Sequence, residues 1–139
     1  MKKITLYLFC SLLLLSLPSV AIENAKNIKV TKLIETDTSW EETKITYPNG
    51  DTKITALLVE MQPKAKMQMH HHEVPSFGYI LEGKITVQSE SGDIKTFSKG
   101  DVVIEMINKK HYGVNPENTV TKFIVFYMGT ENLNNTIIE

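Results

Sequence analysis

Short segments rich in β-branched and apolar residues recur along the chain after residue 28. They cover residues 29–34, 53–59, 84–88, 101–107 and 120–127, and several of them alternate apolar with polar positions. Alternation of this kind places successive side chains on opposite faces of a β-strand. Gly, Pro, Asn and Asp separate the segments at short intervals, as expected for turns. The pattern predicts an all-β domain without helices, built as a sandwich or barrel of short strands.

The first 21 residues follow a different pattern. Two lysines come directly after Met1, residues 4–17 are almost entirely apolar, and the small residues Ser19 and Ala21 occupy the positions that a signal peptidase reads. This order predicts a secretory signal peptide over residues 1–21. A membrane anchor is the alternative, but the apolar run is shorter than the roughly 20 residues that a membrane span needs. Lysine-rich usage without arginine is typical of an AT-rich bacterial source, so we expect a periplasmic protein that leaves the membrane after cleavage.

The remaining chain is long enough for one domain with a single core. We expect N-terminal strands and a turn over residues 22–52, the β-barrel itself over residues 53–130, and a C-terminal tail over residues 131–139. The only cysteine, Cys10, lies inside the signal peptide. The mature chain therefore has no disulfide framework, no thiol nucleophile and no thiolate metal site.

The charge balance excludes several classes of partner. Without the two lysines of the signal peptide, 13 basic residues face 16 acidic ones, a net charge of about −3. Such a balance argues against nucleic acid or an anionic membrane as a partner. Every basic residue is a lysine, so no guanidinium is present to bind a carboxylate or a phosphate through two parallel hydrogen bonds. We expect a small-molecule ligand or substrate.

Three of the four histidines stand in a row, at positions 70, 71 and 72. If this segment is extended, Gln68, His70 and His72 share one face, and His71 points to the other together with the neighbouring methionines. His70 and His72 then form a pair of imidazoles that can bind one metal ion, and His71 only fills the position between them. The same alternation places Met67 away from the pair, which argues for a packing role and against a copper–thioether site.

Around these histidines and His111, the sequence resembles the cupin superfamily over most of the mature chain. The first cupin motif contains H-x-H followed by a glutamate and a glycine, and His70, His72 and Gly83 match it. The second motif contains G-D, a turn, a histidine and an asparagine, and residues 100–101 with His111 and Asn115 hold that spacing. The resemblance implies a single small jelly-roll β-barrel and allows a homodimer.

The resemblance also implies a metal site, with two departures from the family pattern. Ser76 stands where the family has its glutamate ligand, and Met106 and Asn108 replace the proline and glycine of the second-motif turn. The ligand set implied is therefore His70, His72 and His111. Imidazole ligands suit Fe(II), Mn(II), Ni(II) and Zn(II) alike, so we expect one divalent transition metal without choosing among these four.

Glu105 is a second candidate for the site. It stands in the otherwise apolar segment 102–107, where a buried carboxylate is destabilising unless a partner compensates its charge. One alternative places it on the outer surface in water. The other places it inside the domain, where it replaces the missing carboxylate ligand or acts as a general acid or base.

Six further residues are expected to line the pocket or to support the ligands. Ser76 and Gly78 share a face with the ligands if the strand begins at Ser76, and their small side chains leave space beside the metal. Tyr112 is either a lid or a rim residue, and Lys110 either holds an anion or stays in solvent. The full set is Gln68, Ser76, Gly78, Lys110, Tyr112 and Asn115.

Three functions are compatible with this arrangement, because the fold supports many activities. The first is a mononuclear metalloenzyme of the dioxygenase, lyase or isomerase kind, with open coordination positions for a small organic substrate. The second is a non-catalytic module that binds or senses a metal or a small ligand. The third is a metal-free structural barrel. Glu105 separates the first two, because only an enzyme needs an acid–base group.

Overall fold

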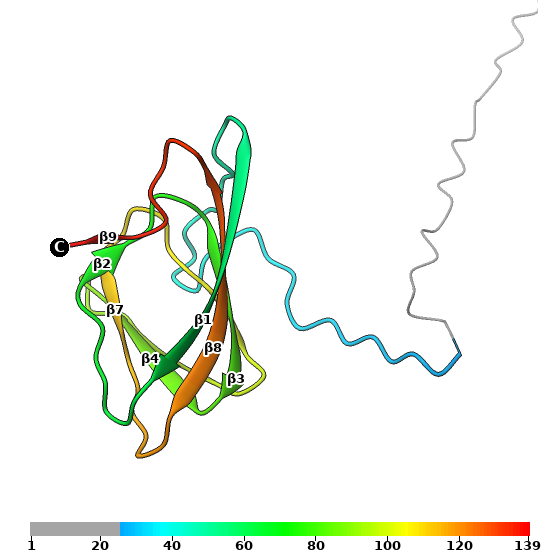
Figure 1. Ribbon diagram of the computed structural model, residues 1–139, viewed down its shortest axis with the longest axis vertical. Coiled ribbons are helices and arrows are strands. Elements are labelled where there is room, and N and C mark those ends of the chain that lie inside the picture. Colours follow the sequence, from blue (N-terminus) through cyan, green and yellow to red (C-terminus); the bar gives the residue numbers. More distant parts are fainter. Residues whose placement is uncertain (1–25) are drawn as a thin grey trace, which may run out of the picture. The chain divides into compact units, whose positions relative to one another are not determined.

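The computed structural model describes residues 26–139 (Figure 1). The predicted signal peptide lies outside the described residues, so it remains a prediction. Residues 32–139 form one compact unit. Within the described part of the chain no helix is long and apolar enough to span a membrane.

The described chain is all-β, as predicted from the sequence, and contains nine strands. The longest are β1 and β8, with ten residues each. The shortest are β2, which contains His70 and His71, and β9 near the C-terminus, with two residues each. The strands are β1 (Thr52–Met61), β2 (His70–His71), β3 (Ser76–Glu82), β4 (Lys84–Ser89), β5 (Ile94–Ser98), β6 (Val102–Ile104), β7 (His111–Val114), β8 (Thr121–Thr130) and β9 (Ile137–Ile138).

These strands form two antiparallel sheets. The four-stranded sheet has the order β1-β8-β3-β6, and the five-stranded sheet has the order β5-β4-β7-β2-β9. In Figure 1 the strands β1, β8 and β3 run together on one side of the domain and β2, β7 and β4 on the other. Strand hydrogen bonding stays within two separate sheets, so the described domain is a jelly roll of two facing sheets, as the resemblance implied, and the barrel is not closed by hydrogen bonds.

The core fills the space between the two sheets. Alternate residues of β8 are buried, and Phe123 and Val125 meet Ile85 and Val87 of β4 from the facing sheet. The opposite set of side chains on β1 and β8 points outward, where several apolar residues stay exposed. The homodimer that the sequence resemblance allows remains a prediction.

A glycine fixes the corner between β3 and β4. Gly83 has a φ angle of 73°, in the left-handed backbone region that favours glycine. A Cβ atom at this position would lie 2.6 Å from the Thr121 hydroxyl oxygen. The Thr121 hydroxyl also donates a 2.7 Å hydrogen bond to the carbonyl of Lys84. The corner therefore needs a residue without a side chain, which explains the glycine of the first motif in physical terms.

The predicted strand over residues 29–34 is not formed. Its apolar side chains are exposed, with Val30 at 48% and Leu33 at 59% of full exposure. The segment has the composition of a strand, but no strand of the described chain pairs with it, and an isolated strand cannot satisfy its backbone groups. The segment that follows does pack: the Trp40 backbone N–H donates a 3.0 Å hydrogen bond to the carbonyl of Ile104, at the end of β6.

The predicted tail, residues 131–139, takes part in the fold. Strand β9 pairs with β2, so that His70 lies opposite Ile138 and His71 opposite Ile137. The backbone N–H of Glu139 also donates a hydrogen bond to the carbonyl of Met69. In Figure 1 the C-terminus lies beside β2. The last residues therefore form the edge of the five-stranded sheet next to the histidines.

Candidate metal site

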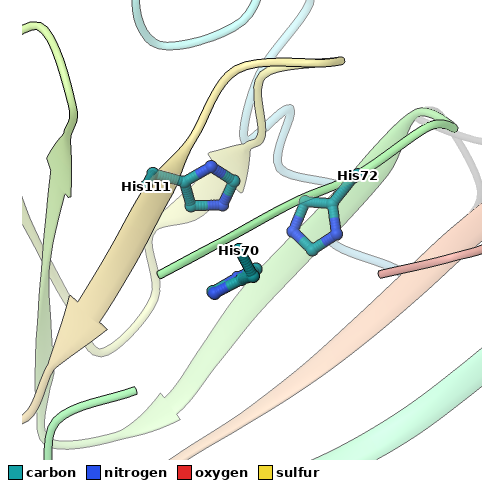
Figure 2. A group of neighbouring side chains, drawn as sticks. All are labelled: His70, His72 and His111. Atoms are coloured by element: carbon teal, nitrogen blue, oxygen red, sulfur yellow. The ribbon is translucent and has the colours of Figure 1, made fainter. Parts of the chain in front are cut away.

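Three imidazoles converge between the sheets. One ring nitrogen from each of His70, His72 and His111 lies within 4.8 Å of the others. Their ring centroids are 4.6–5.1 Å apart. Figure 2 shows the three rings directed toward a common space from the β2 segment and from β7. The grouping that the resemblance to cupins implied is therefore present in three dimensions.

Strand pairing brings these residues together. His70 of β2 lies directly opposite His111 of β7 in an antiparallel pair, and directly opposed side chains on one face are close neighbours. His72 follows two residues later on the same face, and an isolated bridge joins it to Ile107. Asn108, in the place of the family's turn glycine, has a φ angle of 56°, a conformation that asparagine tolerates better than most residues. The turn geometry therefore survives the substitution.

Each of the three histidines uses its Nδ1 atom for a backbone carbonyl. His70 Nδ1 lies 2.7 Å from the carbonyl oxygen of Gln68, and His111 Nδ1 lies 2.8 Å from that of Lys109. His72 Nδ1 lies 2.8 Å from the carbonyl oxygen of Asn135. A carbonyl can only accept, so Nδ1 carries the proton and Nε2 keeps its lone pair. Metal-binding histidines are commonly oriented in this way.

The electrostatic surroundings keep the rings neutral. Burial lowers the pKa of His70 and of His111, and it lowers the pKa of His72 to about 3. The neighbouring His111 lowers the pKa of His72 further. A neutral imidazole is the form that binds a metal. His111 Nε2 is buried and has no hydrogen-bond partner, so its lone pair is available to coordinate a metal ion.

Glu105 faces the same space, which is the inward alternative considered above. Its Oε2 lies 3.5 Å from His111 Nε2, and its side chain is 15% exposed. This oxygen has no hydrogen-bond partner. Burial raises the pKa of Glu105 to about 7, against the opposing effect of His70. A carboxylate with a raised pKa beside three imidazoles can bind a cation or transfer a proton near neutral pH.

His71 lies apart from the cluster, as its position in the row predicts. Its Nδ1 lies 3.2 Å from a carboxylate oxygen of Glu139. Met67 was predicted to point away from the pair, and this prediction is wrong: Met67 lines the cavity beside His70. The pairing of Lys66 with Val114 and of His70 with His111 leaves one extra residue on the first segment. An extra residue of this kind shifts the alternation by one position.

The small residues do not form the pocket that the sequence suggested. Neither Ser76 nor Gly78 is among the residues that line the cavity. A Cβ atom on Gly78 would lie 3.6 Å from the Cβ atom of Val103, so a neighbouring strand fills that space. Ser76 contributes its carbonyl, which accepts a 3.0 Å hydrogen bond from the Glu105 N–H. The residue in the place of the family glutamate thus contacts the backbone of the carboxylate that lines the cavity.

The other supporting residues have structural surroundings. The Tyr112 hydroxyl donates to Gln88, and Lys110 lies 3.0 Å from Glu139. The buried Asn115 amide donates to the carbonyls of Met61, Gln62 and Thr119, which ties neighbouring loops together. None of these three side chains lines the cavity. Gln68 acts through its carbonyl on His70, and it borders a shallower depression next to the cavity.

Sequence reasoning missed two contributions to the site. The first is the tail, where the Asn135 carbonyl and the Thr136 hydroxyl both approach His72 Nδ1. The second is Trp40, whose buried indole lies near the Glu105 carboxyl group and lowers its pKa. Both lie far from the histidines in the sequence, and only the lone tryptophan was a visible signal.

The cavity between the histidines and the four-stranded sheet has a volume of about 70 Å³. Glu105, the three histidines and the Tyr127 hydroxyl form its polar part. A shallower depression shares Met67, His70 and Tyr127 with it and continues to Ile138 of β9. The rest of the cavity wall is apolar, made by Val59, Met67, Ile85, Val87, Phe123 and Val125.

A family model described as "Cupin domain" matches residues 57–127. The chain belongs to the cupin family. None of the curated proteins matches it. The matched range contains all three histidines and Glu105, and it leaves out Trp40 and the tail.

Solved cupin structures share the fold at low sequence identity. A sugar phosphate isomerase of the cupin superfamily from Silicibacter pomeroyi is 21% identical, with a TM-score of 0.53, over 62% of this chain and 56% of that one. A cupin-like protein from Thermotoga maritima is 21% identical, with a TM-score of 0.55, over 62% and 64%. An oxalate decarboxylase from Lactobacillus farciminis is 24% identical, with a TM-score of 0.54, over 61% and 26%. The chain thus covers less than two thirds of each.

The donor set fits a divalent transition metal. Cupins commonly bind a metal, and here three neutral imidazoles present unprotonated nitrogens to one space, with a carboxylate beside them. Borderline ions such as Fe(II), Ni(II) and Zn(II) accept such mixed nitrogen and oxygen donors. The geometry is therefore suited to one ion.

Proposed function

We propose that this cupin is a secreted, mononuclear metalloenzyme that acts on a small organic molecule, with His70, His72 and His111 as the metal ligands. The observation that carries the proposal is the convergence of three Nε2 atoms beside an unpartnered, buried Glu105 carboxylate. A structural barrel without a metal gives no reason for a carboxylate and three neutral imidazoles to share one buried space, since unpaired buried polar groups are destabilising.

The bound metal would supply open coordination positions and a Lewis acid to a substrate. The protein supplies the rest. Backbone carbonyls hold the three rings in one tautomer, and the apolar wall limits the access of water. Glu105, with a pKa raised to about 7 by burial, takes up or gives off a proton at Oε2 near neutral pH.

The reaction class stays within dioxygenase, lyase or isomerase chemistry. Solved structures with this fold include an isomerase, a decarboxylase and a salicylate 1,2-dioxygenase, so the fold alone does not select the reaction. The proposed location is the periplasm, on the basis of the signal-peptide pattern. Mass spectrometry of the protein from a periplasmic extract should give an N-terminus at Ile22.

Metal analysis of the protein purified from its native periplasm tests the site, and oxygen-consumption and product screening of the loaded protein tests the enzyme. We expect one Fe, Mn, Ni or Zn ion per chain. Substoichiometric metal after purification without chelators would refute the metal site. Full metal occupancy without turnover of any small organic substrate would favour the alternative, a cupin that only binds or senses a metal or small ligand.

A further inference from the structure

The cavity contains no positive side chain. Its titratable residues are Glu105, Tyr127 and the three histidines, which are the proposed metal ligands. The two lysines that precede His111 are engaged elsewhere: Lys110 pairs with Glu139, and Lys109 pairs with Glu41. The chain has no arginine at all. A ligand that carries an anionic group away from the metal would therefore meet no cation.

The wall that faces the histidines is apolar. It consists of aliphatic and aromatic side chains from both sheets together with Met67. Apart from the uncharged Tyr127 hydroxyl, these side chains offer no polar group and no cation to a carboxylate, phosphate or sulfonate. Burying an ion against such a wall carries an uncompensated desolvation penalty, whereas burying an alkyl group there is favourable.

The cavity is also small. Its volume of about 70 Å³ is about half of the ~150 Å³ of an apolar cavity that holds benzene. The side chains of Ile85 and Met67 pack directly against Gly113, where a Cβ atom would lie 2.8 Å from the Ile85 side chain and 3.2 Å from the Met67 sulfur. The wall is thus closely packed around a space for a few non-hydrogen atoms.

We infer that the substrates of this site are small molecules with one metal-binding polar end and a short, uncharged apolar remainder. This inference rests on the proposed metal site and adds the substrate class to it. It excludes sugar phosphates, dicarboxylates and other molecules with a second anionic group, because no cationic side chain lines the cavity to compensate such a charge.

Two thiols of matched length test the inference by binding rather than by turnover. The full chain is loaded with Co(II), and the absorption of the cobalt–thiolate bond is followed during titration with 1-propanethiol and with 3-mercaptopropane-1-sulfonate. Both present the same sulfur, and only the second carries an anion at its far end. We expect 1-propanethiol to bind at least about tenfold more tightly, because the sulfonate would be desolvated without a partner.

The outcomes of this titration distinguish a failure of the substrate class from a failure of the metal site. Equal or tighter binding of the sulfonate, or no binding of either thiol to the cobalt-loaded protein, would overturn the substrate class and leave the metal site intact. A protein that takes up no cobalt would overturn the metal site and the substrate class together.

A cavity-enlarging variant tests the size limit separately. Phe123→Ala removes one ring from the apolar wall, and such truncations leave part of the removed volume empty. The affinity ratio of 1-hexanethiol to 1-propanethiol should rise at least about tenfold in this variant, because a longer apolar tail fits the new space. An unchanged ratio in a folded variant would show that the wall does not set the size of the ligand. If the variant does not fold, the comparison of the two thiols on the native chain still decides the inference.

Discussion

Replacing Glu105 by Gln removes a buried charge while nearly preserving the shape of the side chain. The carboxylate has no hydrogen-bond partner for its Oε2, and it lies 3.5 Å from a neutral imidazole. In the metal-free protein its charge is therefore poorly compensated. We expect Glu105→Gln to stabilise the metal-free protein and, at the same time, to weaken metal binding.

The magnitude follows from the pKa of Glu105, which burial raises from 4.5 to about 7. Since one pKa unit corresponds to about 1.4 kcal/mol, the ionised carboxylate lowers the free energy of unfolding by about 3 kcal/mol. The effect has a defined pH window. Above pH 7 the carboxylate is ionised in both states and the full penalty applies; below pH 4.5 it is protonated in both states and the penalty disappears.

Urea denaturation in the presence of a chelator, at pH 8 and at pH 4.5, measures this difference. The Gln variant should be more stable than the native chain by up to about 3 kcal/mol at pH 8 and about equally stable at pH 4.5. Glu60→Gln is a matched control, because Glu60 lies on the outer surface, 3.3 Å from Lys122. An exposed pair of this kind should change stability by less than about 1 kcal/mol at either pH.

The same two proteins are then compared with metal. A nearby carboxylate favours a bound cation, so Glu105→Gln should lower metal affinity by about 10- to 100-fold. The reasoning would be refuted by a Gln variant that is no more stable at pH 8, or by an equal stability difference at both pH values. Unchanged metal affinity with the stability change intact would remove Glu105 from the metal site and keep it as a buried acid.

Three further predictions concern the residues around the metal. His71→Ala should leave the metal content unchanged, whereas His70→Ala or His111→Ala should remove most of it; equal losses by elemental analysis in all three would contradict the assignment of ligands. Burial lowers the pKa of His72 from 6.5 to about 3, so the unfolded state of the metal-free protein takes up a proton first as the pH falls below 6.5. At pH 5 this lowers the free energy of unfolding by about 2 kcal/mol, and His72→Asn should abolish that loss in urea titrations. The same pH dependence of the free energy of unfolding in the native chain and in the variant would contradict this prediction. Because Trp40 is the only tryptophan and lies near Glu105, Ni(II) should quench its fluorescence with a one-to-one endpoint, and an unaltered emission would place the ion elsewhere.

The sequence by itself determined the strand-rich fold and the identity of the three histidines. The strands and the His70–His72 pair depend on a local rule, the alternation of side chains along a strand, whereas His111 was assigned through the resemblance to the cupin motifs. Alternation also assigned His71 correctly to the other face. The alternation rule failed for Met67, because one extra residue lies between the pairing of Lys66 and that of His70 with the neighbouring strand. Such an extra residue shifts the alternation, and no local signal in the sequence marks it.

Only the tertiary structure decided which residues surround the three histidines and how the site residues are oriented. Glu105 is held beside the histidines by the hydrogen bond from its backbone N–H to the carbonyl of Ser76, which lies 29 residues earlier in the chain. The orientation of His72 depends on the carbonyl of Asn135, 63 residues away, and the tail becomes a strand only because β2 offers a free edge. The segment 29–34 shows the converse: it has the composition of a strand but finds no partner within the described chain. Strand composition is a local property, whereas pairing, burial and the pKa shifts that follow from burial are set by contacts between residues far apart in sequence.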